Sequence, residues 1–345
     1  METTVKVNLP QNLSIEDAAM FESFQSYSIG EQTVKYLNNV FVAYSGFCKD
    51  EYGVIKESHH AYPDMEERLV KNLQFFDEAI AISPELLLEL DDDNTYLLIH
   101  HSWFTNYYHW ICEGILRLWL VKDRMHEMIL LLPETLKNIE FIMSALEPFC
   151  FKEIRFMPTY QCLQVKNLCL PQIKPICDSY DTVLVNEIRE FYRQYSATKT
   201  ASSLKMGKKI FLSRKKSTQR KIVNEAEVEA LMIKHGFQVV YNEDLSFWEQ
   251  VSVYANANCL VSIHGAGLTN MIFMEDNSTI LELHKRKTNA KDWHSLAYWY
   301  LADALNFTYY HQICDPRDKE EHFFTADFIV DTDKLEVSLA KFSKC

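Results

Sequence analysis

The second half of this chain alternates regularly between short apolar runs and amphipathic segments, and this alternation limits the folds that it can adopt. Apolar runs of strand length recur at 209–213, 237–241, 259–263 and 279–283. Segments with helical character lie at 224–235, 246–256 and 291–305. Strands that alternate with helices favour right-handed βαβ units around a parallel sheet. We therefore predict an α/β protein whose second half is a doubly wound domain.

The length of 345 residues is enough for about two domains. Residues 196–209 are polar and weakly patterned, and they mark the predicted boundary. We predict an N-terminal α/β domain over 1–200, a Rossmann-like domain over 201–322 and a separate C-terminal segment over 323–345. Within the first domain, 108–122 has the periodicity of a helix with one apolar face.

Composition excludes some classes of function. The formal net charge is −13, which argues against nucleic-acid binding because that usually needs a basic face. No run of about 18 uninterrupted apolar residues occurs, and the first residues lack the pattern of a signal peptide. The nine cysteines form no Cys-x-x-Cys pair, so we expect reduced structural thiols rather than a zinc site. Together these features predict a cytoplasmic protein.

The most informative motif follows the apolar run 259–263. It reads His264-Gly265-Ala266-Gly267-Leu268-Thr269-Asn270, in a chain with only 8 glycines. Glycine lets the backbone approach a ligand closely, and the N–H groups of a first helical turn bind phosphate. The motif is not the Gly-x-Gly-x-x-Gly fingerprint of dinucleotide-binding proteins. We predict an anionic ligand here; the structural alternative is a simple tight turn between strand and helix.

Two further features fall at the ends of predicted strands. Arg214 and Arg220 lie in a basic stretch after the strand 209–213, and Glu282 lies near the end of the strand 279–283. In an open parallel sheet, ligands bind outside the carboxyl ends of the strands. Arginine pairs with phosphate through its planar fork, and a carboxylate accepts hydrogen bonds from ribose hydroxyls. The set therefore indicates a nucleoside diphosphate, although alone each residue also suits a solvated loop or a strand end.

These residues resemble glycosyltransferase family 61. The resemblance covers roughly residues 95–310 and includes Arg214, Arg220, Asn224, Glu225, Gln250, the loop 264–270 and Glu282. In the first half, Asn106, His109 and Glu113 are similar to an N-terminal element of the family, in which aspartate is frequent where this chain has glutamate. The resemblance implies a GT-B fold, with two Rossmann-like domains facing across a cleft. It also implies that the second domain holds the donor and that the last segment packs back on the first.

What the resemblance implies about activity is an inverting glycosyltransferase. It would move a sugar from a nucleotide-diphosphate sugar, UDP-linked, to a glycan or lipid-linked oligosaccharide acceptor in bacterial surface polysaccharide or glycoconjugate synthesis. No cofactor is required, and stimulation by Mn²⁺ or Mg²⁺ stays open. Peripheral association with the inner face of the membrane and homo-oligomerisation also stay open. The alternatives are a GT-B-type sugar-nucleotide epimerase and a non-catalytic subunit that binds a sugar or nucleotide.

The predicted catalytic residues are His109 and Glu113. They are four residues apart, so on a helix they share a face. One would accept the proton of the acceptor hydroxyl and the other would orient it or contact the sugar. We favour Glu113 as the base because a partly desolvated carboxylate can have its pKa raised toward neutrality. The structural alternative is that His109 caps the helix and Glu113 forms a surface pair with Arg117.

The predicted donor site comprises the residues of both loops and the strand-end carboxylate: Arg214, Arg220, His264, Gly265, Ala266, Gly267, Thr269, Asn270 and Glu282. No residue is assigned to a metal ion. The run Asp91–Asp93 is acidic, but its neighbours indicate an exposed turn rather than a metal site.

Overall fold

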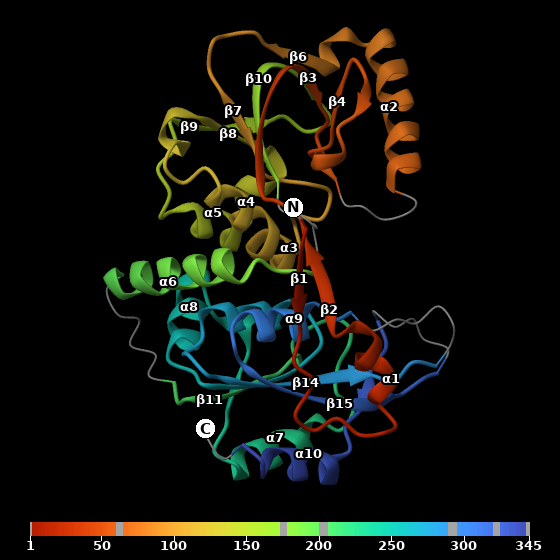
Figure 1. Cartoon of the computed structure of the whole chain (residues 1–345), viewed down its shortest axis with the longest axis vertical. Coiled ribbons are helices and arrows are strands. Elements are labelled where there is room, and N and C mark those ends of the chain that lie inside the picture. The colour runs from red at the N-terminus through yellow and green to blue at the C-terminus, as the bar shows by residue number, and fades with distance from the viewer. Residues whose placement is uncertain are drawn as a thin grey trace. The chain divides into compact units, whose positions relative to one another are not determined.

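The computed structural model describes residues 2–59, 65–172, 178–199, 206–288, 295–319 and 325–342. The chain forms two compact units, which are visible in Figure 1. The first comprises Met1–Thr3 and Ser28–Cys177, and the second comprises Thr4–Tyr27 and Asp178–Cys345. Each unit is built on a β-sheet with helices, so the predicted α/β class is confirmed.

A mixed eight-stranded sheet forms the centre of the first unit. Its order is β5–β4–β3–β10–β7–β8–β9, and β6 pairs with the first residues of β10. Strands β10, β7, β8 and β9 are parallel, whereas β3, β4 and β5 pair antiparallel. The strands are β3 (Thr33–Val42), β4 (Cys48–Asp50), β5 (Gly53–Val54), β6 (Leu87–Leu90), β7 (Tyr96–Leu98), β8 (Ile129–Pro133), β9 (Glu153–Met157) and β10 (Cys162–Gln172).

The helices of the first unit include one interrupted helix that carries the predicted catalytic residues. They are α2 (Met65–Ile82), α3 (Tyr107–His109), η4 (Trp110–Ile115), α4 (Leu116–Trp119) and α5 (Glu140–Leu146). The single helix predicted over 108–122 is therefore two short α-helices joined by the π-helical turn η4 and ending at Trp119. Apolar periodicity does not distinguish an α from a π turn over so short a stretch.

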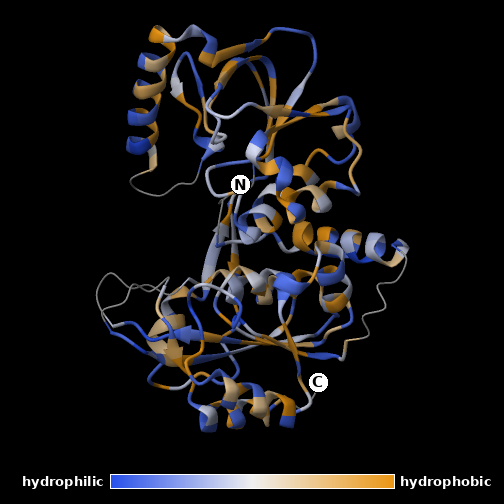
Figure 2. Ribbon diagram, turned by 180° about the vertical axis from the view of Figure 1, so that it is seen from behind, coloured by the Kyte–Doolittle hydropathy of each residue, from blue (hydrophilic) through white to orange (hydrophobic). Residues whose placement is uncertain are grey.

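A six-stranded sheet forms the centre of the second unit. Its order is β12–β11–β13–β14–β15–β16, parallel except for β16 at the edge. The strands are β11 (Lys209–Leu212), β12 (Gln238–Val240), β13 (Cys259–Ile263), β14 (Thr279–Lys285), β15 (Thr308–Pro316) and β16 (Phe328–Ile329). Strands β13 and β14 are buried throughout and β11 nearly so, as expected for a sheet that is covered on both faces, and Figure 2 shows hydrophobic residues in the middle of this sheet.

Helices cover both faces of this second sheet, which makes the unit doubly wound as predicted. Helices α7 and α10 lie on one face, and α8 and α9 lie on the other (Figure 1). The helices are α6 (Thr182–Thr198), α7 (Glu225–Lys234), α8 (Phe247–Ala255), η8 (Ala266–Phe273), α9 (Ala297–Ala304) and α10 (Thr332–Leu339). Short 3₁₀-helices in the chain lie at Glu22–Phe24, Lys56–Ser58, Pro84–Leu86, Met125–Glu127, Glu134–Asn138 and Asn242–Asp244.

The units divide the chain differently from the predicted boundaries. Helix α6 belongs to the second unit, because Tyr192 is buried and its ring lies 5.9 Å from that of Phe247 in α8 and 5.7 Å from that of Phe273 in η8. The described part of the last segment also belongs there, since β16 pairs with β15 and α10 packs on α7. The described part of this segment is therefore part of the second unit, where the sequence predicted a separate segment. The polar stretch 196–209 lies within the second unit, partly outside the described residues.

The structure bears on two predictions that concern the cellular compartment: the state of the cysteines and the lack of a membrane-spanning segment. Among the described cysteines, six are free thiols, but Cys259 at the start of β13 is disulfide-bonded. The prediction that every cysteine is reduced is thus wrong for Cys259. Disulfides are typical of oxidising compartments, so the cytoplasmic location stays a prediction. Over the described residues, no helix has both the length and the apolar character needed to cross a membrane.

Residues 4–27 belong to the second unit through contacts that the sequence analysis did not predict. Strands β1 (Thr3–Lys6) and β2 (Ser26–Ile29) form a small sheet, and α1 (Ala18–Phe21) lies between them in the chain. The Phe21 ring is fully buried, 4.9 Å from the Trp299 ring and 4.6 Å from the His311 ring. The Trp299 indole N–H donates to the carbonyl of Asn8 at 2.8 Å. These contacts hold residues 4–27 against α9 and β15.

We predict that Phe21→Ala lowers the free energy of unfolding by about 3 kcal/mol, because it removes a buried ring and leaves a cavity. Ile15→Ala is the matched control, since the Ile15 side chain in the same segment is 97% exposed. It should change the free energy by less than about 0.5 kcal/mol. Chemical denaturation of both variants measures the difference. Equal small effects would show that the segment does not contribute to the core.

Candidate active site

The strand order of the second sheet creates one topological switch point. The first strand of this sheet in the chain, β11, lies between β12 and β13, and the order then continues to β14 and β15. Successive connections therefore leave β11 toward opposite edges, and the crevice at such a point is where open α/β sheets bind ligands. The loops that follow β11 and β13 contain the predicted arginines and the glycine motif. Both loops meet at the carboxyl edge of the sheet.

The two arginines converge on Gly265. A Cβ atom at this glycine would lie 2.9 Å from Nη1 of Arg214 and 3.7 Å from Nη2 of Arg220. Arg214 donates to the carbonyl of Gln219 at 3.4 Å, and Arg220 donates to the carbonyl of His264 at 3.2 Å. Glycine at this position therefore leaves room for both guanidinium groups beside the backbone of the motif.

Both guanidinium groups are partly buried, and among the residues that the structure describes neither forms an ion pair with a carboxylate, although the negative charge of Glu243 acts on Arg214. Their Nε atoms are buried and make no hydrogen bond there. Burial lowers the pKa of Arg214, and burial together with the positive charge of Arg214 lowers the pKa of Arg220 to about 10. Two neighbouring positive charges that are partly removed from water are costly unless an anion compensates them. The pair is therefore suited to bind a polyanion such as a diphosphate.

The backbone at Arg220 is strained. Its φ is 56°, in the left-handed region that residues other than glycine rarely adopt. The conformation is held by the backbone N–H of Arg220, which donates to the Thr325 carbonyl at 3.2 Å. The N–H of Lys221 then donates to the carboxylate of Asp327 at 2.8 Å. Such strain is typical of residues that a fold aims at a ligand.

The glycine motif leads into η8, which is a 3₁₀-helix. The sequence predicts that a helix starts here but does not give its type. A Cβ at Gly267 would lie 2.6 Å from Cδ2 of Leu212, so close packing against β11 requires glycine there. Ala266 and Gly267 are partly exposed, whereas Thr269 and Asn270 are completely buried. Asn270 donates to the Gln250 side chain of α8 at 3.1 Å. The structure thus places Thr269 and Asn270 where they support the loop, not on its surface.

Glu282 is enclosed by protein groups. One carboxylate oxygen bonds Nδ1 of His264, and the other accepts from the Tyr309 hydroxyl at 2.7 Å and lies 3.4 Å from Nε2 of His284. Burial alone would raise the pKa of Glu282, but His284 and His264 lower it well below its ordinary value. The residue has no exposed surface. The direct ribose contact expected from the sequence therefore does not fit, and Glu282 instead orients the His264 ring.

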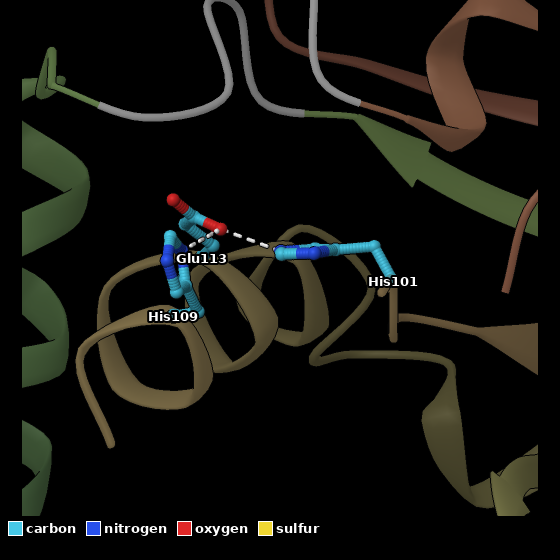
Figure 3. A group of neighbouring side chains, drawn as sticks. All are labelled: His101, His109 and Glu113. Carbon is cyan, nitrogen blue, oxygen red and sulfur yellow. Dashed lines mark hydrogen bonds and ion pairs between the residues drawn. The ribbon is translucent and has the colours of Figure 1, made fainter. Parts of the chain in front are cut away.

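A second carboxylate–histidine cluster lies in the first unit and is drawn in Figure 3. Asn106 caps α3 by accepting from the N–H of Tyr108 at 2.9 Å, which starts the helix that carries His109 and Glu113. Oε2 of Glu113 lies 3.0 Å from Nδ1 of His109 and 2.5 Å from Nε2 of His101. The structure thus brings the two predicted residues together and adds His101, whose role no local sequence pattern identifies.

The surface pair considered as an alternative for Glu113 does not form at the surface. Glu113 and Arg117 are both buried, and Arg117 donates to the carbonyl of Ile99 at 3.3 Å. Burial lowers the pKa of Arg117 to about 10, and the negative charge of Glu113 partly offsets this effect. In contrast, Asp91, Asp92 and Asp93 are exposed, as expected for an acidic turn.

The second unit is thus an α/β unit with a doubly wound sheet, in which Arg214 and Arg220 lie at the switch point. The chain belongs to glycosyltransferase family 61, because the sequence model of Glycosyltransferase 61 matches residues 107–281. The family resemblance is thus confirmed. The match includes the His109–Glu113 cluster, both arginines and the glycine motif.

Animal enzymes are among the similar proteins. The human protein O-linked-mannose β-1,4-N-acetylglucosaminyltransferase 2 is 34% identical over 110 residues, which cover 30% of this chain and 19% of that protein. The dog enzyme of the same name is 33% identical over 110 residues, which again cover 30% of this chain and 19% of that protein. The EGF domain-specific O-linked N-acetylglucosamine transferase of Drosophila melanogaster is 35% identical over 77 residues, 21% of this chain and 15% of that protein. The matched region spans under a fifth of each relative.

We predict that Glu282→Gln lowers the free energy of unfolding at pH 7 by about 2 kcal/mol, because it removes a buried charged acceptor of hydrogen bonds. The folded-state pKa of Glu282 is lowered, so its stabilising contribution is present at neutral pH and is lost as the pH falls below the ordinary value of 4.5. The difference between wild type and variant should therefore shrink in acid. Denaturation at several pH values tests this, with exposed Glu16→Gln as control.

Proposed function

We propose that this chain transfers a sugar from a nucleotide-diphosphate sugar to a hydroxyl of a glycan acceptor. The observation that carries the proposal is the pair Arg214 and Arg220, two partly buried guanidinium groups that meet at Gly265 on the switch point of a parallel sheet. Glycosyl transfer from such a donor releases a diphosphate, which is the group that this pair of charges suits. Membership of family 61 supports the same reaction class.

For the donor, we propose UDP-N-acetylglucosamine as the first candidate. The uridine nucleotide follows from the family resemblance, and N-acetylglucosamine is the sugar in the names of the human and Drosophila relatives. Those names specify O-linked mannose on protein and an EGF domain as acceptors. Both belong in an acceptor screen beside the lipid-linked oligosaccharide of a bacterial polysaccharide pathway.

In the proposed mechanism, one displacement inverts the anomeric carbon. A base in the first unit takes the proton of the acceptor hydroxyl, the acceptor oxygen bonds the anomeric carbon, and the bond from that carbon to the diphosphate oxygen breaks. Arg214, Arg220 and His264 then stabilise the charge that develops on the diphosphate. The two arginines provide positive charge that a metal ion would otherwise supply, so we propose a metal-independent reaction on a GT-B arrangement of the units.

We predict that Arg214→Ala and Arg220→Ala each weaken UDP binding by about 10- to 100-fold, the equivalent of about 1.5–3 kcal/mol for hydrogen bonds to a charged group. Arg220→Lys should recover part of the loss, because it restores the charge without the planar fork. Lys215→Ala is the control: Lys215 lies in the same loop, is 55% exposed and pairs with Glu229. Isothermal titration with UDP measures each affinity. Unchanged binding in both alanine variants would contradict the site.

We predict that the wild-type chain consumes UDP-N-acetylglucosamine and releases UDP in proportion to a glycosylated product only when an acceptor is present. Mass spectrometry of an O-mannosyl peptide, an EGF domain and a lipid-linked oligosaccharide detects the product. A sugar-nucleotide epimerase would instead change the donor without acceptor. Failure to consume any of the UDP-, GDP-, CMP- or TDP-sugars, with a folded protein, would favour a non-catalytic binding subunit.

A further inference from the structure

The hydrogen bonds within the cluster of His101, His109 and Glu113 bear on which ring nitrogen of each histidine carries a proton. His101 precedes α3, His109 is the last residue of α3, and Glu113 lies in η4. Both histidines bond the same carboxylate oxygen, Oε2 of Glu113 (Figure 3). An ionised carboxylate only accepts hydrogen bonds, so each histidine donates to it.

The tautomer of His101 follows from its second ring nitrogen. The backbone N–H of Trp103 donates to Nδ1 of His101 at 3.3 Å. This nitrogen is thus an acceptor, and in the neutral ring the proton lies on Nε2, which faces Glu113 at 2.5 Å. His101 is therefore a neutral donor held from both sides. It is not placed to receive a proton from a substrate.

The tautomer of His109 follows from the same carboxylate. Its Nδ1 donates to Glu113, so in the neutral ring the nitrogen that can accept a proton is Nε2. The side chains of His101 and Glu113 are 1% and 3% exposed, whereas that of His109 is 16% exposed. His109 is thus the most exposed member of the cluster, and Glu113, which bonds it, is buried.

We propose that His109 is the catalytic base and that His101, acting through Glu113, is a positioning residue that sets the tautomer of His109. This inference rests on the proposed transfer reaction. The proton of the acceptor hydroxyl moves to Nε2 of His109, while the acceptor oxygen bonds the anomeric carbon and the electron pair of the broken bond leaves with the diphosphate. Glu113 stabilises the imidazolium that results, as buried carboxylates do in other histidine-based sites.

This assignment reverses the sequence-based preference for Glu113 as the base. A carboxylate oxygen that accepts two N–H groups and is shielded from solvent is a poor partner for an incoming hydroxyl. The carboxylate that bonds both rings is instead placed to orient His109. The acid in the pair thus has the supporting role, and the imidazole has the chemical one.

A divalent metal ion is a different way to use two histidines and a glutamate, and the ligand atoms here do lie close enough together for one. Its geometry fits less well. Ligand atoms around a tetrahedral ion are roughly 3.3 Å apart, given bonds of about 2.0–2.1 Å, whereas the nitrogen–oxygen distances here are 2.5 and 3.0 Å. A metal on Nε2 of His101 would also require a proton on Nδ1, which already accepts from Trp103.

The first test reads the tautomers directly in the full-length wild-type protein. Long-range ¹H–¹⁵N NMR of the imidazole rings at neutral pH should show His101 with its proton on Nε2 and His109 with its proton on Nδ1. His109→Gln and His101→Phe spectra assign the resonances. A proton on Nε2 of His109 overturns the proposal. Stoichiometric shifts of both rings on addition of ZnCl₂ overturn it as well, in favour of a metal site.

The second test uses the pH dependence of activity, measured on the donor and acceptor that the wild type accepts. Among the described residues, the titratable groups near His109 are Glu113, which bonds it, His101 and Tyr108, whose rings lie 5.6 and 5.1 Å from its ring, and Arg117 one turn beyond Glu113. His101→Phe leaves the full charge of Glu113 to His109, so the acid limb of kcat/KM should move to higher pH by about half a unit or more. Glu113→Gln removes that charge and should move the limb to lower pH.

The magnitude of turnover separates the base from its supports. His109→Gln should lower kcat by about 10²- to 10⁴-fold with unchanged UDP affinity, as expected for loss of a general base. His101→Phe should lower kcat about 10-fold with unchanged KM for the donor. Exposed His126→Asn is the matched control and should behave as wild type. Acid limbs that stay in place in both variants of the supporting residues would overturn the positioning role.

Failure of the proposed function gives a different pattern. If the wild-type chain transfers no sugar from any donor, the proposed transfer reaction is contradicted, and so is the role of His109 as its base. The NMR experiment would still report the tautomers, because it needs no substrate. An active wild type with the opposite His109 tautomer instead leaves the transfer reaction standing and overturns only the assignment of His109 and His101.

Discussion

The parallel pairing of β11 with β13 is the interaction on which the meeting of the two arginines and the glycine motif depends. The register of the two strands places Leu212 opposite Ser262, and the Ser262 hydroxyl adds a hydrogen bond of 2.9 Å to the Leu212 carbonyl. Because both strands end at the same edge, the loops that follow them become neighbours although they are far apart in the chain. The close fit of Gly267 against Leu212 then holds the glycine motif on the sheet, and Gly265 leaves the space in which Arg214 and Arg220 meet.

A second physical theme is the buried carboxylate that orients histidines, and it occurs once in each unit. Glu113 bonds His101 and His109, and Glu282 bonds His264 and lies beside His284. In each cluster, one histidine is more exposed than its carboxylate. A charge inside a protein must be satisfied by donors, and that requirement fixes which imidazole nitrogen faces the carboxylate. The other nitrogen of His109 or His264 is thereby directed elsewhere.

Prediction from the sequence succeeded where the signal was local. The apolar runs that match β11, β13 and β14 are buried on both faces, so their composition alone identifies them. The arginines and glycines were selected because few other residues do their chemistry, and the structure brings them together at Gly265. The domain boundary was missed because α6 and the segment 4–27 join the second unit through distant contacts, such as that of Phe21 with Trp299. His101 was not assigned to the site because Glu113, to which it bonds, lies 12 residues further along the chain, so no local spacing links the two.

The α/β class, the membership of family 61 and the positions of the arginines and of the glycine motif can be read from the chain alone, since they depend on periodicity and residue chemistry along it. The enclosure of Glu282 by His264 and Tyr309 and the bonding of Glu113 to two histidines are visible only in the folded protein. This is because the role of a titratable side chain depends on its burial and on which donors surround it. Both are set by the packing of segments that are remote in sequence.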